Sequence, residues 1–107
     1  MNSVLVVFIT CPDHASADQL AIELIEQRHA ACVNLMPGLT SVYRWAGKIE
    51  KDQEVLLVAK TTDTAFAGLK TCVQTLHPAE LPEIIAMPVS DGLPKYLQWV
   101  NAETSKQ

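Results

Sequence analysis

Residues 39–61 read LTSVYRWAGKIEKDQEVLLVAKT, and this stretch decides the fold. Polar and apolar side chains alternate along its first part, a pattern typical of a strand with one buried face. Ala46-Gly47 supplies a turn in the middle. The stretch therefore predicts a long β-hairpin with one arm at residues 40–46 and the other at residues 48–61.

The segments on either side of the hairpin predict two strand–helix units. Residues 3–10, SVLVVFIT, are almost continuously apolar, the pattern of a central strand covered on both faces. Pro37-Gly38 is expected to end the next strand, and Asp63 is expected to cap the second helix. The predicted strands outside the hairpin are 3–10, 31–36 and 83–89, and the predicted helices are 13–30, 64–76 and 93–102.

This order of elements indicates an α+β fold, the ferredoxin-like βαββαβ sandwich, with an extra C-terminal helix. We expect one domain over residues 1–107. The hairpin arms are longer than two helices can cover, and the tip carries Tyr43 and Trp45. Because an exposed strand edge favours pairing with another chain, we expect the sheet to extend between copies of this chain.

Composition argues against several kinds of partner. The net charge is −4 and the eight Lys and Arg residues are scattered, so nucleic acid is not expected as a partner. The apolar run at residues 4–9 is too short to cross a bilayer and has no basic flank, so we expect a soluble, cytoplasmic protein without membrane contact. Three cysteines without a CxxC motif favour neither a disulfide framework nor a four-cysteine zinc site.

The sequence carries no pattern typical of an enzyme. It has no GxSxG motif, and its four glycines form no phosphate-binding loop. Glu50, Asp52 and Glu54 alternate along one predicted strand and are interpreted as a solvent-facing row rather than a catalytic pair. We therefore predict no catalytic residues and no required cofactor.

Three blocks of motifs stand out together. The first is residues 30–61, beginning AACVNLMPGLTSVYRW; the second joins His77-Pro78 to Pro82-Glu83-Ile84; the third is Tyr96-Leu97-x-Trp99. In order and spacing they closely resemble the CutA divalent-cation tolerance family, over about residues 4–100. The resemblance implies a ferredoxin-like homotrimer similar to that of the PII signal proteins. It also implies a role in divalent-cation tolerance, with copper or another divalent metal ion as ligand and no established catalytic activity.

Two sets of residues are candidate metal ligands. The first joins the thiol of Cys11 to the imidazole of His77, two ligand types that copper prefers. Some relatives carry the thiol at the position of Ile9 and a second histidine at that of Leu76, so this chain offers a reduced set. The second set is local, Cys11-x-x-His14. The alternative is that His77 binds no metal ion and is a hydrogen-bonded histidine that fixes the turn before Pro78.

A small-molecule sensor is another hypothesis, because clefts form between the subunits of PII-like trimers. A further alternative is a structural or adaptor trimer without a ligand, in which the two hairpin aromatics only pack against a neighbour. The candidates for lining a ligand cleft are Tyr43, Trp45, Glu50 and Lys60, together with His77.

Residues 75–85, TLHPAELPEII, contain a histidine and two carboxylates, like the start of a metal site. Their two prolines suit the end of a helix and the start of a strand, so we interpret the stretch as a connection. Glu80 and Glu83 are therefore not expected to be ligands. Ala79 stands where the family usually has a tyrosine, so we expect a roomier and wetter pocket beside His77.

Overall fold

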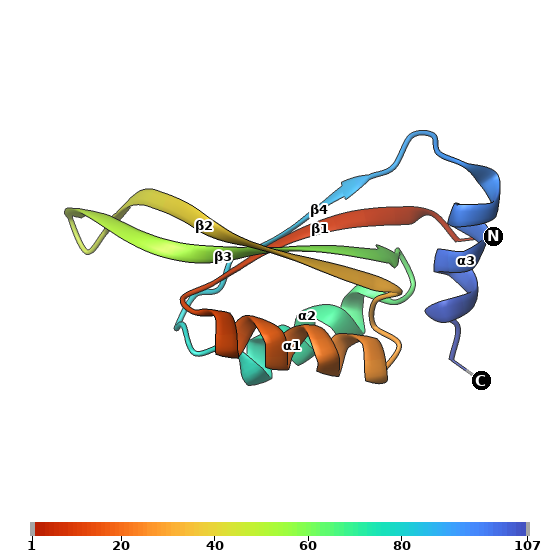
Figure 1. The fold of residues 1–107 in the computed structure, drawn as a ribbon, viewed down its shortest axis with the longest axis horizontal. Helices are drawn as coiled ribbons and strands as arrows, with labels where there is room; N and C mark the ends of the chain where they lie inside the picture. Colours follow the sequence, from red (N-terminus) through yellow and green to blue (C-terminus); the bar gives the residue numbers. More distant parts are fainter. Residues whose placement is uncertain (1, 107) are drawn as a thin grey trace.

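The chain pairs four antiparallel strands into one sheet and covers one face of that sheet with two helices (Figure 1). The computed structural model describes residues 2–106. The strand order β2-β3-β1-β4 confirms the predicted ferredoxin-like topology. In chain order the elements are β1 Val4–Cys11, α1 His14–Glu26, β2 Cys32–Trp45, β3 Lys48–Thr62, α2 Phe66–Leu76, β4 Ile84–Pro88 and α3 Pro94–Glu103.

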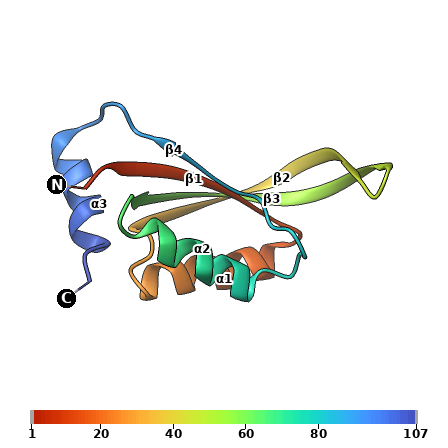
Figure 2. The same ribbon diagram turned by 180° about the vertical axis from the view of Figure 1, so that it is seen from behind.

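The core lies between the sheet and the two helices α1 and α2, which lie side by side on one face (Figure 2). Side chains alternate across a strand, so every second residue of β1 faces this core. The core residues are Val7, Ile9 and Cys11 of β1, Val55, Leu57 and Ala59 of β3, Ala17, Leu20, Ala21 and Leu24 of α1, and Leu69 and Val73 of α2, with Ala30.

Strand β2 is longer than predicted. Pro37-Gly38 does not end it, and the two separately predicted segments join into one strand with a register shift between Met36 and Leu39. Gly38 has a φ of +87°, which a side chain would disfavour, and it supplies the local irregularity. Pro37 is tolerated because β2 lies at an edge of the sheet, where one row of backbone groups needs no partner.

Both long helices have ends that differ from the prediction. Helix α2 begins at Phe66 with no side-chain cap, so the predicted cap by Asp63 is wrong; its carboxylate accepts the Thr64 N–H at 2.9 Å. Helix α1 ends at Glu26 rather than near residue 30. Arg28 there adopts a left-handed φ of +60°, which turns the chain toward β2.

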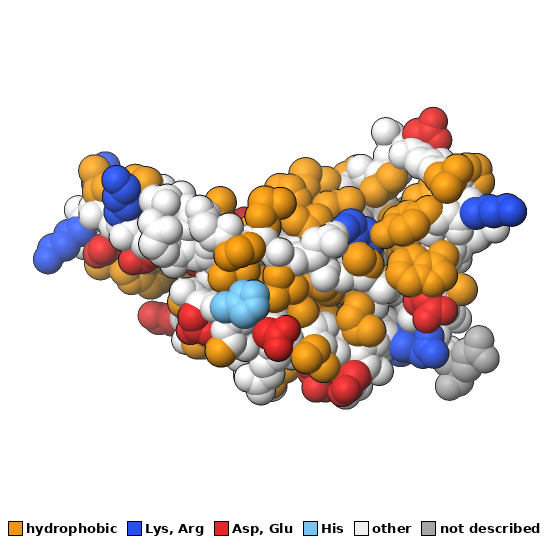
Figure 3. Space-filling view, in the orientation of Figure 1, with side chains coloured by type: hydrophobic (Ala, Val, Ile, Leu, Met, Phe, Trp, Pro, Cys, Tyr) orange, Lys and Arg blue, Asp and Glu red, His pale blue; other side chains and the backbone are white. Residues whose placement is uncertain are grey.

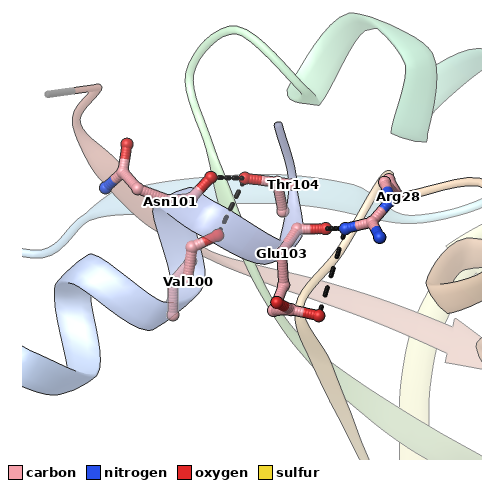
Figure 4. A network of polar contacts seen from close by, with 5 residues as sticks. All are labelled: Arg28, Val100, Asn101, Glu103 and Thr104. Carbon is pink, nitrogen blue, oxygen red and sulfur yellow. Dashed lines mark hydrogen bonds and ion pairs between the residues drawn. The ribbon is translucent and has the colours of Figure 1, made fainter. Parts of the chain in front are cut away.

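Helix α3 packs at the end of the sheet opposite the hairpin tip (Figure 1). Figure 4 shows its last turn, where the Arg28 guanidinium donates to the Glu103 carbonyl at 3.1 Å and lies 4.0 Å from the Glu103 carboxylate. The Thr104 hydroxyl donates to the Val100 carbonyl at 2.8 Å. Within residues 2–106, no helix is both long and apolar enough to cross a membrane.

The second face of the sheet, here called the open face, is covered by neither α1 nor α2. Cross-strand pairs assign its members, because paired residues lie on the same side. Figure 3 shows hydrophobic side chains gathered over the sheet and toward α3, whereas the hairpin end carries acidic and basic ones. The apolar members of the open face are Val6, Phe8, Met36, Leu56, Val58, Ile85 and Met87. Of these, Met36 and Ile85 are more than half exposed.

Candidate functional site

A cavity of about 490 Å³ lies between the hairpin and the connection from α2 to β4. The hairpin projects past the ends of α1 and α2, and the connection crosses the base of that projection (Figures 1 and 2). The cavity is therefore built by segments that are far apart in the sequence. Its lining residues are Thr10, Ser41, Val42, Tyr43, Trp45, Glu54, His77, Ala79, Glu80, Leu81, Pro82 and Glu83.

His77 ties the connection to the sheet. Pro78 disfavours a helical backbone for the residue before it, so α2 ends and His77 takes an extended conformation with φ −71° and ψ 134°. The ring Nδ1 accepts the Ala79 N–H at 3.0 Å, and Nε2 donates to the Thr10 carbonyl at 2.6 Å. Because Nδ1 accepts, this arrangement holds the neutral imidazole with its proton on Nε2.

These contacts agree with the interpretation of His77 as the residue that fixes the turn. With one nitrogen donating and the other accepting, the ring has no free lone pair to offer a metal ion. Ala79 takes part through its backbone, and its small side chain lines the cavity, as the expectation of a roomier pocket requires.

Cys11 lies on the opposite side of β1 from this cavity. It is fully buried in the core, and burial, followed by the negative charges of Asp13 and Glu54, raises the pKa of the thiol to about 11. A thiol must lose its proton to bind a metal ion, so this environment opposes ligation. His14, the other half of the local set, is exposed at the first residue of α1.

Both residues of the predicted metal pair, Cys11 and His77, lie in environments that oppose metal binding. Within residues 2–106, no three His, Cys, Asp or Glu side chains are grouped so that they could hold a metal ion. Metal ligation by Cys11 and His77 stays a prediction. In this arrangement it requires the release of both hydrogen bonds of His77 and the ionisation of a buried thiol.

The predicted ligand residues separate into two groups. Tyr43 and Trp45 line the same cavity as His77, but Glu50 and Lys60 do not. Lys60 lies ten residues beyond Glu50 on β3, about 33 Å along a strand, and it donates to the side-chain carbonyl of Asn34. Sequence reasoning therefore named three of the residues that line this cavity and two that do not.

Tyr43 is oriented by a carboxylate that the sequence did not single out as a ligand. Its hydroxyl donates to Asp52, and this hydrogen bond, with smaller contributions from desolvation and from the charges of Asp52, Glu50 and Glu54, raises the pKa of Tyr43 to about 12. The phenol consequently stays protonated at neutral pH and acts as a donor. The row of alternating carboxylates along β3 was the signal for this contact.

A second cavity, of about 640 Å³, lies between α1 and α2 on the outer side of the molecule. His29 lines it, and burial followed by the charge of Lys106 lowers the pKa of this imidazole. The Lys106 ammonium donates to His29 Nδ1 at 3.1 Å. Gly68 lies directly beneath the ring, where a methyl group would be 2.6 Å from its nearest atoms.

Comparison with known proteins places this geometry in a defined family. A family model described as CutA1 divalent ion tolerance protein matches residues 5–103. The divalent-cation tolerance protein CutA of Thermus thermophilus is 50% identical over 99 residues, which cover 92% of this chain and 96% of that protein. The human protein CutA is 47% identical over 96% of this chain, and the match spans 58% of the human protein's length.

Solved structures give the same result. The crystal structure of CutA from Xylella fastidiosa superposes with a TM-score of 0.94 at 47% identity, over 96% of this chain and 99% of that one. CutA1 from Oryza sativa superposes with a TM-score of 0.95 at 38% identity, over 99% and 97% of the two chains.

Proposed function

Because this chain belongs to the CutA1 divalent ion tolerance family, we propose that it acts in the tolerance of divalent cations and catalyses no reaction. The family model extends from residue 5 to residue 103, and this continuous match carries the proposal. The names of the relatives from Thermus thermophilus and Yersinia pestis state the same role for those proteins. Copper is the divalent ion that we propose first, because thiol and imidazole side chains favour it.

Growth under metal stress tests this role directly. A bacterial strain that lacks its own family member is complemented with this chain and grown on graded concentrations of Cu²⁺, Zn²⁺ and Co²⁺. We expect the complemented strain to grow at higher Cu²⁺ concentrations than the strain with an empty vector. Identical growth limits for both strains, with the protein present at normal levels, would contradict the proposal.

Metal binding is a separate question from tolerance, and calorimetric titration with Cu(II) and Cu(I) addresses it. We propose that copper reaches Cys11 and His77 only when the connection that carries His77 opens, since both imidazole nitrogens are otherwise bonded. Binding is then weak in the wild type and lost in His77→Ala. His14→Ala is the matched control and keeps the binding; loss in that variant instead would favour the local Cys11-x-x-His14 set.

We further propose that the chain assembles as a homotrimer. The open face exposes 52% of Ile85 and 57% of Met36, and the projecting hairpin exposes 64% of Val42 and 70% of Ile49. Exposed apolar surface of this kind, next to two sheet edges, favours burial against other copies of the chain. Light scattering coupled to gel filtration is expected to give three times the mass of one chain, and Ile85→Glu is expected to shift it toward the monomer.

A cytoplasmic location is the accompanying proposal. The three cysteines are free in the structure, as is usual for proteins kept in a reducing compartment. One solved relative, from Archaeoglobus fulgidus, is described as periplasmic. Fractionation of cells that express the chain without an added tag distinguishes the two compartments.

A further inference from the structure

We propose that His29 is a pH-sensitive switch that holds the C-terminal segment, residues 105–106, at neutral pH and releases it in acid. The neutral imidazole accepts a hydrogen bond from the Lys106 ammonium. The protonated imidazole is repelled by that ammonium and attracted by the Glu23 carboxylate, so acid exchanges one partner for the other. This proposal does not depend on the role in metal tolerance, and either can fail without the other.

The contact between His29 and Lys106 joins parts of the chain that are 77 residues apart. The Lys106 Nζ lies 3.1 Å from His29 Nδ1. Because an ammonium group can only donate, Nδ1 accepts, and the imidazole is neutral with its proton on Nε2. An added proton binds at Nδ1, the one ring nitrogen with a lone pair. Protonation therefore removes the acceptor and places a second positive charge beside the ammonium.

The fold keeps the His29 ring in place when its partner leaves. Gly68 of α2 lies beneath the ring, where a methyl group would be 2.6 Å from Nδ1 and Cε1. The His29 carbonyl accepts the Thr61 hydroxyl at 2.6 Å, and its N–H donates to the Leu24 carbonyl at 2.9 Å. The ring lies on the side of the sheet that α1 and α2 cover (Figure 2), opposite the open face that the proposed homotrimer buries.

The titratable groups around the ring set the pH at which it responds. Glu23 of α1 and Cys72 of α2 line the same cavity as His29, and Lys106 approaches from the C-terminal segment. Burial, followed by the charge of Lys106, lowers the pKa of His29 from its usual 6.5, whereas the charge of Glu23 raises it. Burial and the charge of Glu23 raise the pKa of the Cys72 thiol, which therefore stays neutral. The contact is thus intact at neutral pH and is lost as the pH falls below 6.5.

The residues before the C-terminal segment are held by contacts that do not titrate in this range. The Arg28 guanidinium donates to the Glu103 carbonyl at 3.1 Å and lies 4.0 Å from the Glu103 carboxylate (Figure 4). The buried Thr104 hydroxyl donates to a backbone carbonyl of α3 at 2.8 Å. Carboxyl groups titrate near pH 4, and guanidinium groups stay charged. Protonation of His29 therefore releases the C-terminal segment and leaves α3 in place.

Release of the C-terminal segment opens a small cavity at the start of α2. This cavity has a volume of about 260 Å³, and Ser105 and Lys106 form part of its wall. Ala65, the residue before α2, also lines it and provides no side-chain cap. The first N–H groups of an α-helix have no partner within the helix. The switch therefore controls the access of water to the start of α2.

An NMR titration of the intact assembled protein from about pH 7.5 to about pH 5 tests the switch. The ¹H–¹³C signals of the imidazole report the protonation of His29, and ¹⁵N relaxation of the Ser105 and Lys106 amides reports their release. We expect the order parameters of both amides to fall below about 0.6, the range of flexible backbone, with the midpoint of the imidazole titration. The Thr104 amide should stay ordered throughout. Order parameters that do not change, or that change with a different midpoint, would overturn the proposal.

Substitutions of the two charged partners are expected to shift the pKa of His29 in opposite directions. Lys106→Gln removes the positive charge but keeps a donor and should raise this pKa, whereas Glu23→Gln should lower it. Asp18→Asn, the matched control, removes a charge from an exposed position elsewhere on α1 and should leave the pKa unchanged. His29→Gln keeps an acceptor that does not titrate, so the C-terminal segment should stay ordered in acid. Shifts in the same direction from Lys106→Gln and Glu23→Gln, or release in His29→Gln, would refute the switch.

Discussion

His77→Ala tests whether one imidazole holds the α2–β4 connection on the sheet. The substitution removes two hydrogen bonds, 2.6 Å to the Thr10 carbonyl and 3.0 Å from the Ala79 N–H. Each such bond contributes about 0.5–1.5 kcal/mol net, so we expect the free energy of unfolding to fall by about 1–3 kcal/mol. Urea denaturation followed by circular dichroism, at a fixed chain concentration, measures the change.

Two further substitutions at the same position separate the two bonds. His77→Asn retains an acceptor near the position of Nδ1, and His77→Gln retains a donor near that of Nε2, so each variant should lose about half of the total. Hydrogen exchange of the Ala79 amide should accelerate in His77→Ala and His77→Gln but not in His77→Asn. His14→Ala, at an exposed position, is the control. A loss below about 0.5 kcal/mol in His77→Ala would refute the reasoning.

Three other outcomes follow from single residues. Burial raises the pKa of the Cys11 thiol to about 11 from a usual 9.0, so its contribution to stability is complete below pH 9 and is lost as the pH rises through 11. The free energy of unfolding of the wild type should therefore fall between pH 9 and pH 11, and Cys11→Ala should make it less dependent on pH in this range. Gly68→Ala should cost about 1–3 kcal/mol because the new methyl group meets the His29 ring, and His29→Ala should reverse part of the loss in thermal unfolding. Ala46 and Gly47 in the hairpin turn both have positive φ, which asparagine tolerates better than alanine. Ala46→Asn should therefore raise the free energy of unfolding, measured by urea denaturation, by about 0.5–1 kcal/mol.

The sheet and its order were predictable because alternation and apolar runs report directly on which strand faces are buried. Residues 3–10 indicated a central strand, and β1 is indeed paired on both sides, by β3 and β4. The expectation that Pro37-Gly38 ends a strand was wrong. Proline and glycine weaken strand pairing locally, but at an edge strand a bulge absorbs both residues while pairing resumes beyond them.

Helix ends were harder to predict, because local preference competes with tertiary packing there. Asp63 has the residue type of a cap, yet its carboxylate is used by the next backbone N–H and α2 begins three residues later. Asp13, by contrast, does cap α1 and accepts the Ser16 N–H at 2.7 Å. Nothing in the sequence separates these two aspartates.

The candidate site was predictable only in part. The sequence named Tyr43, Trp45 and His77, but the sharing of one cavity by these three depends on the hairpin crossing the α2–β4 connection. Thr10 carries no motif, and only the folded chain shows that its backbone carbonyl accepts the hydrogen bond from the His77 ring.

The sequence by itself determined the element order, the hairpin and the family resemblance, because periodicity and spaced motifs are properties of the chain. Only the tertiary structure decided what the candidate ligands do. The sequence suggested Cys11 and His77 as a ligand pair. The alternation of side chains along β1 instead places the Cys11 thiol in the core, and the His77 imidazole donates to the backbone carbonyl of Thr10. Sequence states which donor atoms exist, whereas packing and hydrogen bonding determine which of them remain free.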